Sequence, residues 1–128
     1  IKEYLKVRCP MNLVTVMFKK SSVEAVGGFI DWYCEEDYYL WARMFMANQR
    51  FANLSDILVN VRVGEDMYKR RGGAKYFKSE ASFQKYLLKN KIITPGTYIL
   101  NVAKRLLVQV LMPNSIRGFI FKKFAREN

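Results

Sequence analysis

Apolar residues recur along the chain with two different periods, which divide it into a part with short strands and a helical part. Apolar, mostly β-branched residues favour a buried strand at residues 14–18, and residues 51–54 and 57–63 are predicted to form two short strands. The last of these alternates between apolar and polar residues, so one of its faces is polar. From about Tyr68 onward the apolar spacing becomes helical, and it stays so to the end of the chain.

Two helices are predicted within the first part. A serine caps a short helix over residues 23–26, which Gly27 ends because glycine readily adopts a left-handed backbone conformation. Asp37 is predicted to cap a longer helix over roughly residues 38–48. The apolar residues at helical spacing in this second helix are Leu40, Trp41, Met44 and Phe45.

The second part is predicted to hold three helices, over roughly residues 74–89, 97–111 and 115–126. A Pro-Gly pair and a Pro-Asn pair separate them. The fold class expected from these elements is α+β, with a few short strands followed by a C-terminal helical region. We place the boundary after Gly73, which gives one unit of residues 1–73 and another of residues 74–128.

The net charge of the chain indicates which kinds of partner it binds. It has 128 residues and a formal net charge of +11, from 22 Lys and Arg against 11 Asp and Glu. This excess indicates an anionic partner, such as nucleic acid, a phospholipid surface or a phosphorylated small molecule; charge that serves only solubility is the alternative. Glu127 is the sole carboxylate after Glu80, so the positive charge is concentrated in the helical part.

Three further features limit the possibilities. Cys9 and Cys34 match no metal-ligand spacing, and both are expected to be free thiols. The sequence has no run of about 20 uncharged apolar residues, which argues against a membrane-spanning helix. Because it starts at Ile1 and enters directly into a charged segment, we expect it to be a piece of a longer polypeptide.

Carboxylates crowd the start of the helix predicted at residues 38–48. They are Asp31, Glu35, Glu36 and Asp37, and the aromatic residues among them are Phe29, Trp32, Tyr33 and Tyr38. Aromatic walls with carboxylates suit a sugar, whose apolar face stacks and whose hydroxyls donate hydrogen bonds. A carboxylate is also a plausible general base toward a hydroxyl. The alternative is that these residues only stabilise the helix N-terminus, where acidic side chains are common.

A basic segment, residues 62–73, is the second candidate site. It combines Arg62, Arg70 and Arg71 with two glycines. Guanidinium groups bind phosphate in a bidentate manner, and a glycine backbone allows an anion to approach closely. The segment is neither a Walker loop nor a dinucleotide-binding fingerprint, so a solvated loop leading into a helix is the alternative.

The last two predicted helices combine apolar residues with Lys and Arg, as an interfacial helix does. For residues 97–111, packing on the same domain is at least as good an interpretation. For the tail, attachment to an anionic membrane surface competes with completion of the core. The tail residues that favour the membrane are Phe119, Phe121, Phe124, Arg117, Lys122, Lys123 and Arg126.

Several stretches, taken in order, resemble the C-terminal, acceptor-side half of family 2 glycosyltransferases with the GT-A fold, of the bacterial surface-polysaccharide kind. The resemblance covers roughly half of the chain. The matching stretches are residues 12–21, Gly27-Gly28-Phe29, residues 36–44, residues 51–53, Leu58-Val59 and residues 62–73. Leu13 departs from the pattern, because family members often carry His there.

The resemblance implies a partial α/β GT-A fold and an inverting transferase that moves a sugar from a nucleotide-sugar donor to a polysaccharide or lipid-linked acceptor. It makes Asp37, with Glu36 beside it, the catalytic base that deprotonates the acceptor hydroxyl. It implies that the arginines face a diphosphate and that the glycines line the sugar and acceptor cleft. The substrate-binding candidates are Gly27, Gly28, Phe29, Trp32, Arg62, Arg70 and Arg71.

The resemblance also implies a partner half outside this sequence. A divalent metal, Mg²⁺ or Mn²⁺, is expected in the full-length enzyme, held by an Asp-X-Asp motif in the N-terminal half; no metal ligand is expected in this chain. The isolated chain is therefore expected to be inactive, and an open apolar face or sheet edge favours a homodimer. Because lipid-linked acceptors are used in polysaccharide assembly, a cytoplasmic location peripheral to the inner face of the cytoplasmic membrane is expected.

Two other function classes compete with this interpretation. A nucleic-acid-binding module would set basic residues among exposed aromatic residues, whereas here the aromatic residues surround carboxylates that repel phosphate. No nucleic-acid partner is therefore expected. A membrane-surface interaction module would need only the basic tail, and it would bind vesicles even without Asp37.

Overall fold

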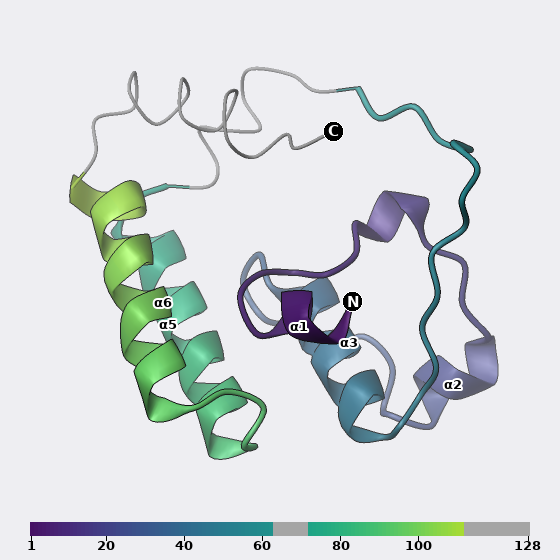
Figure 1. Cartoon of the computed structure of the whole chain (residues 1–128), viewed down its shortest axis with the longest axis horizontal. Helices are drawn as coiled ribbons and strands as arrows, with labels where there is room; N and C mark the ends of the chain where they lie inside the picture. Colours follow the sequence, from purple (N-terminus) through teal and green to yellow (C-terminus); the bar gives the residue numbers. More distant parts are fainter. Residues whose placement is uncertain (63–71, 112–128) are drawn as a thin grey trace.

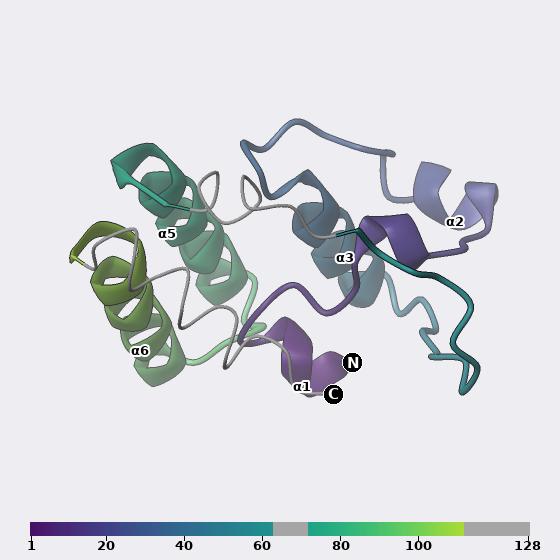
Figure 2. The same ribbon diagram turned by 90° about the horizontal axis from the view of Figure 1, so that it is seen from above.

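The computed structural model describes residues 1–62 and 72–111, and the regular structure within these ranges is helical (Figure 1). In chain order the elements are α1 (Lys2–Leu5), a 3₁₀ turn (Leu13–Thr15), α2 (Lys20–Glu24), α3 (Glu36–Met46), α5 (Ala74–Lys89), α6 (Pro95–Leu106) and a π-helical turn (Leu107–Leu111). Figure 2 shows α5 and α6 side by side, with α3 across from them and α2 on the far side of α3. None of the described helices is long and apolar enough to cross a bilayer.

The α+β prediction, and with it the partial α/β sheet, is wrong, because the described residues contain no strand. Residues 14–18 form the end of the 3₁₀ turn and an extended stretch, and residues 51–62 run along the outside of the molecule (Figure 1). A strand is stable only when its backbone groups pair with a neighbour. Within the described residues these stretches have no such partner, and Ile57 and Leu58 are accordingly 93% and 70% exposed.

The helix predictions agree with the structure better than the strand predictions. The helix predicted at residues 74–89 is confirmed as α5, and the one at residues 97–111 is present with an earlier start, at Pro95. The start is earlier because the side chain of Thr94 accepts a hydrogen bond from the backbone of Thr97, and proline needs no partner for its nitrogen at the first position. The helix predicted at residues 115–126 lies outside the described residues.

The core forms where α3 packs against α5. Leu40 and Trp41 from α3 and Phe83 and Leu87 from α5 are all fully buried. The inward orientation predicted for Leu40, Trp41 and Met44 is therefore confirmed. Because this cluster takes residues from both sides of Gly73, the two parts share one core, and the division proposed at Gly73 stays a prediction.

Helix α6 contacts α5 through a row of polar side chains, in addition to Tyr98, which packs against the core. Asn101, Arg105 and Gln109 follow one another at intervals of four residues and so share one face. Arg105 Nε lies 2.8 Å from Glu80 Oε1, and the two side chains are only 13% and 11% exposed. Gln109 Nε2 donates to Glu80 Oε2, and Asn101 Nδ2 donates to Gln84 Oε1 at 2.9 Å. We call these five residues the polar network.

The polar network also fastens the start of the chain to the helical hairpin. Asn101 Nδ2 donates to the Lys6 carbonyl at 2.9 Å, and Arg105 Nη2 donates to the Val7 carbonyl at 2.8 Å. The hydroxyl of Tyr38 donates to the Leu5 carbonyl, which joins the same segment to α3. Residues 5–7 are therefore held between α3 and α6 by hydrogen bonds to their own carbonyls.

We expect Glu80→Gln to lower the free energy of unfolding by about 3 kcal/mol, because it leaves the Arg105 guanidinium buried without its counter-charge. The matched control is Glu24→Gln, which removes the exposed Lys20–Glu24 pair (88% and 62% exposed side chains). That change should cost less than about 1 kcal/mol. Urea unfolding followed by circular dichroism measures both. Equal losses in the two variants would contradict a stabilising role for the buried pair.

Candidate functional site

The candidate site is the N-terminal turn of α3. Glu36 and Asp37 occupy this first turn, where free backbone N–H groups and the helix dipole favour negative charge. The prediction that Asp37 caps the helix is wrong by two residues, because Glu35 holds the N-cap position. Asp37 Oδ1 instead accepts a hydrogen bond from the backbone N–H of Tyr38 at 2.7 Å.

The three adjacent carboxylates have different environments. Glu35 is buried, Glu36 is exposed and Asp37 is half-buried. Burial raises the pKa of Asp37 above its ordinary value, the nearby charge of Glu36 also raises it, and hydrogen bonds from Tyr38 and Cys9 oppose the rise. A raised pKa makes a carboxylate a stronger base. Of the two predicted catalytic residues, Asp37 therefore has the better environment for accepting a proton.

Cys9 lies beside Asp37, a neighbour that nothing in the sequence pattern indicated. Its thiol donates to the Met11 carbonyl at 3.2 Å and also contacts the Asp37 carboxylate. Burial and the charge of Asp37 raise the pKa of the Cys9 thiol to about 12, so it stays protonated and serves as a donor, not a nucleophile. Cys9 and Cys34 are both free thiols, as predicted.

The predicted glycines form a tight turn after α2. Gly27 and Gly28 have φ angles of 85° and 69°, a left-handed conformation that glycine adopts without strain. The Gly27 N–H donates to the Glu24 carbonyl and the Gly28 N–H to the Val23 carbonyl, both at 2.9 Å. These bonds satisfy carbonyls at the end of the helix, as a C-terminal glycine cap does. We call this the Gly-Gly turn.

Arg43 of α3 holds the Gly-Gly turn in place. Its guanidinium donates to the Val26 carbonyl and, at 2.6 Å, to the Gly28 carbonyl. It also stacks over the ring of Tyr39, 4.5 Å from the ring centroid. Arg43 follows Asp37 by six residues, which is about 9 Å along a helix axis. One helix thus carries the candidate base and, about one and a half turns later, the residue that fixes the Gly-Gly turn.

Sequence reasoning assigned no role to Arg43, although the signal was present. Arg43 is a single charge within an otherwise apolar run after Tyr39, and it is nearly fully buried. A charge at a position whose helical spacing predicts burial needs partners, because an unpaired buried charge is very unfavourable. Here two backbone carbonyls and one aromatic ring supply those partners.

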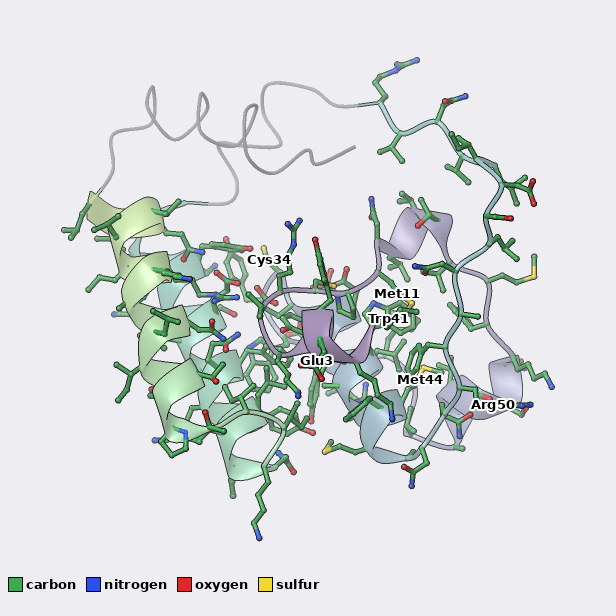
Figure 3. All side chains as sticks on the ribbon, viewed as in Figure 1. Glu3, Met11, Cys34, Trp41, Met44 and Arg50 are labelled. Atoms are coloured by element: carbon green, nitrogen blue, oxygen red, sulfur yellow. The ribbon has the colours of Figure 1, made fainter. Side chains whose placement is uncertain are left out.

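The aromatic candidates lie in two places. Phe29 is partly exposed, and its ring packs against Phe18, with 6.4 Å between centroids; Phe18 in turn packs against Trp41 at 6.3 Å. Trp32 bridges to α5, because its Nε1 donates to the Ser79 carbonyl at 3.4 Å and its ring lies 5.5 Å from that of Phe83. Trp32 therefore contributes to the core, whereas the Phe29 ring has a free surface. Figure 3 shows Trp41 directed into the crowded centre of the molecule.

Of the three predicted arginines the structure describes Arg62 alone, and no contact joins it to the carboxylates. Arg62 is exposed at the end of the first described range, and Arg70 and Arg71 lie outside the described residues. An open pocket of about 770 Å³ lies at the opposite end of α3, bordered by α1 and residues 45–53. No predicted site residue lines that pocket, so a cleft at Glu36 and Asp37 stays a prediction.

The described residues do not fit a metal site. No group of three His, Cys, Asp or Glu side chains within residues 1–62 and 72–111 is placed to hold a metal ion. The charges of Asp37 and Glu35 both act on Cys9, but the Cys9 thiol stays protonated, and a thiol binds metal only as its thiolate. The expectation that the metal ligands lie in the other half of the full-length enzyme stays a prediction.

We expect Arg43→Met to lower the free energy of unfolding by about 2–3 kcal/mol, since two buried carbonyls lose a charged donor. The amide of Gly28 should also exchange its hydrogen faster, because the Gly-Gly turn is released. Arg50→Met, at an exposed arginine just beyond α3, is the matched control. Denaturant unfolding and amide hydrogen exchange measure the two effects. Equal behaviour of both variants would show that the turn does not depend on Arg43.

Asp37 should make the stability of the protein depend on pH. In the unfolded chain its pKa has the ordinary value of 3.8, and burial raises it in the folded state. Between the two values the folded state binds more protons, so the free energy of unfolding falls as pH rises through this window. Asp37→Asn abolishes that fall, so its stability relative to the wild type should improve as pH is raised. Urea unfolding at a series of pH values tests this, with Asp56→Asn as the background; a relative stability that declines with pH would contradict it.

Comparison with known proteins shows that the chain is similar over nearly all of its length to glycosyltransferases. It is 37% identical over 98% of its length to a UDP-Gal:alpha-D-GlcNAc-diphosphoundecaprenol beta-1,3-galactosyltransferase of Escherichia coli. It is 35% identical over 99% to an uncharacterized glycosyltransferase of Haemophilus influenzae, and 32% identical over 96% to an amylovoran biosynthesis glycosyltransferase of Erwinia amylovora.

The chain spans about half the length of these relatives, 46% in each case. No protein-family model matches it. No solved structure matches it at a significant level.

Proposed function

We propose that this chain is the acceptor-side part of a family 2 glycosyltransferase, which transfers a sugar from a nucleotide-sugar donor to a polysaccharide or lipid-linked acceptor. The chain aligns with glycosyltransferases over 96–99% of its length, and this alignment carries the proposal. The name of the Escherichia coli relative specifies a UDP-activated sugar and a diphosphoundecaprenol acceptor, which supports the donor and acceptor classes. Because the chain spans about half of each relative, we assign it a part of the reaction only, and the resemblance of residues 36–44 to the acceptor-side half is the reason for proposing that side.

In the proposed reaction Asp37 is the general base of an inverting transfer. Its carboxylate accepts the proton of the acceptor hydroxyl as that oxygen forms a bond to the anomeric carbon of the sugar. The bond from the anomeric carbon to the diphosphate breaks, and the nucleoside diphosphate leaves with the electron pair. The burial that raises the pKa of Asp37 supports this role, since a raised pKa makes the carboxylate a stronger base.

The protonated Cys9 thiol lies against this base. Its single hydrogen is shared between the Met11 carbonyl and the Asp37 carboxylate, and the Tyr38 N–H occupies Oδ1. A carboxylate oxygen has more than one lone pair, so these bonds leave acceptor capacity for a substrate hydroxyl. Glu36 is exposed in the same turn and is the alternative base.

The remaining candidates are proposed as binding residues. The Gly-Gly turn is held rigidly by Arg43, which suits close approach of a sugar to backbone, and the free surface of Phe29 suits stacking on its apolar face. We propose that Arg62, Arg70 and Arg71 bind the diphosphate, because guanidinium groups match phosphate oxygens in pairs. Trp32 acts through the packing of α3 on α5.

We assign no metal ion to this chain. We propose that the divalent metal of the full-length enzyme is held outside this chain; within residues 1–62 and 72–111 no group of three His, Cys, Asp or Glu is placed to hold one. The proposed location of the enzyme is the cytoplasmic face of the membrane, where a lipid-linked acceptor is held. Nucleic acid is not proposed as a partner, because carboxylates dominate the aromatic site.

In the transferase that contains this chain, Asp37→Asn should lower kcat by on the order of a hundredfold or more, with donor affinity little changed. The substitution keeps the size and the bond to Tyr38 but removes the basicity. Asp56→Asn, the same change at an exposed carboxylate outside the site, should leave turnover near that of the wild type. Initial rates with a nucleotide sugar and a diphospholipid acceptor, and calorimetry with the donor, provide the measurements.

The competing assignments have distinct outcomes. If Asp37→Asn keeps near wild-type turnover while Glu36→Gln loses it, Glu36 is the base and Asp37 stabilises only the helix terminus. If the wild-type transferase moves no sugar from any nucleotide donor, the proposed function is wrong.

A further inference from the structure

Helix α6 and the turn after it are oriented with their polar residues inward and their apolar residues outward. The inward side consists of the polar network residues Asn101, Arg105 and Gln109, which contact α5 and the N-terminal segment. The opposite side is exposed and almost entirely apolar. Its residues are Ile99, Leu100, Ala103, Leu106, Leu107, Val110 and Leu111, which we call the outer apolar face.

The outer apolar face is continuous. Its α6 residues Ile99, Leu100, Ala103 and Leu106 fall within an arc of about 120° on a helical wheel at 100° per residue. They extend along the axis for about 10 Å, at 1.5 Å per residue, and the π-helical turn continues the face to Leu111. Ile99, Leu107 and Leu111 are 66%, 55% and 67% exposed. Figures 1 and 2 both place α6 at one edge of the molecule, so its outer side is accessible.

Helix α6 cannot be rotated to bury the outer apolar face against α5. Rotating α6 to bury it would carry Arg105 to the surface and leave Glu80 buried without its counter-charge, which is strongly unfavourable. The polar network therefore holds the apolar side outward. A contiguous exposed apolar surface of this kind marks a site of interaction with a membrane or another protein.

The positive charge of the chain favours an anionic membrane over another protein as the partner of this face. Lys104 is exposed at the margin of the outer apolar face. After Glu80, nine Lys and Arg residues stand against one carboxylate, and the whole chain carries +11. A helix with an apolar face and cationic flanks inserts at the boundary between headgroups and acyl chains and is attracted by anionic lipid. All backbone groups in the middle of α6 are bonded within the helix, as a lipid environment requires.

We propose that the outer apolar face of α6 docks the protein on an anionic lipid surface. This site is distinct from the tail at residues 115–128, which lies outside the described residues. The choice of lipid over protein agrees with the proposed function, since a lipid-linked acceptor is reached at the same surface. The docking itself needs no sugar transfer, so it can be tested without an active enzyme.

The test compares two double variants of the full chain. Leu100→Gln with Leu107→Gln removes two exposed side chains from the outer apolar face, and Ile57→Gln with Leu58→Gln removes two from the exposed segment at residues 51–62. Circular dichroism verifies that both keep their helices. Sedimentation with vesicles of phosphatidylglycerol and phosphatidylethanolamine should give a partition coefficient lowered by about tenfold or more for the α6 variant. The control variant should bind like the wild type.

A second set of binding measurements tests the contribution of charge. Binding of the wild type should weaken with added salt and be much lower on purely zwitterionic phosphatidylcholine vesicles. Lys104→Gln should lower the partition coefficient on anionic vesicles by a few-fold, because each cation near such a surface contributes about 1 kcal/mol. Binding that is equal on anionic and zwitterionic vesicles would contradict the role assigned to charge.

Two results would overturn the proposal. If the wild type does not bind anionic vesicles, or if the α6 variant binds them as well as the wild type, the outer apolar face is not a lipid-docking site. If the wild type self-associates in sedimentation velocity and the α6 variant is monomeric, while neither binds vesicles, the face is a protein interface. Loss of transferase activity in Asp37→Asn with vesicle binding intact would leave docking supported, so the two proposals fail separately.

Discussion

The ion pair between Glu80 and Arg105 determines which way α6 faces, and both ends of the molecule depend on that orientation. A buried charge must keep its partner, so α6 turns its polar side to α5 and its apolar side to the surroundings. The same Arg105 donates to the Val7 carbonyl, which fixes the segment that leads into Cys9. Cys9 then lies against Asp37. One buried pair thus positions the outer apolar face and one wall of the candidate site.

Helix α3 positions the rest of the site, because it packs into the core through its apolar side and carries two polar residues of the site. Its apolar side packs on α5, while Asp37 occupies the first turn and Arg43 reaches out to the Gly-Gly turn. Rigid support matters for a general base, because proton transfer requires the base within hydrogen-bond reach of the substrate. A base on a helix whose core residues are fully buried keeps that geometry better than a base on a loop.

The success of prediction depended on whether the relevant partner was near in sequence. Helices α5 and α6 followed from local spacing. The N-cap of α3 was predicted at Asp37, two residues from Glu35, which holds it. The strand predictions failed at residues 14–18 and within residues 51–62, because alternation describes a face, not the neighbouring strand that stabilises it. The contact of Cys9 with Asp37 and the pairing of Glu80 with Arg105 join residues more than twenty positions apart, which no periodicity reveals.

Residues 51–62 and the outer apolar face are both exposed and apolar, and the backbone conformation of each determines what it can bind. Residues 51–62 are extended, and within the described residues their backbone groups bond to no neighbouring segment. Placing such a backbone in lipid would leave its N–H and C=O groups without partners, which a bilayer does not tolerate. A pairing strand from a protein would satisfy them. In α6 the helix already satisfies those groups, so only its side chains have to find an apolar environment, and a lipid interface provides one.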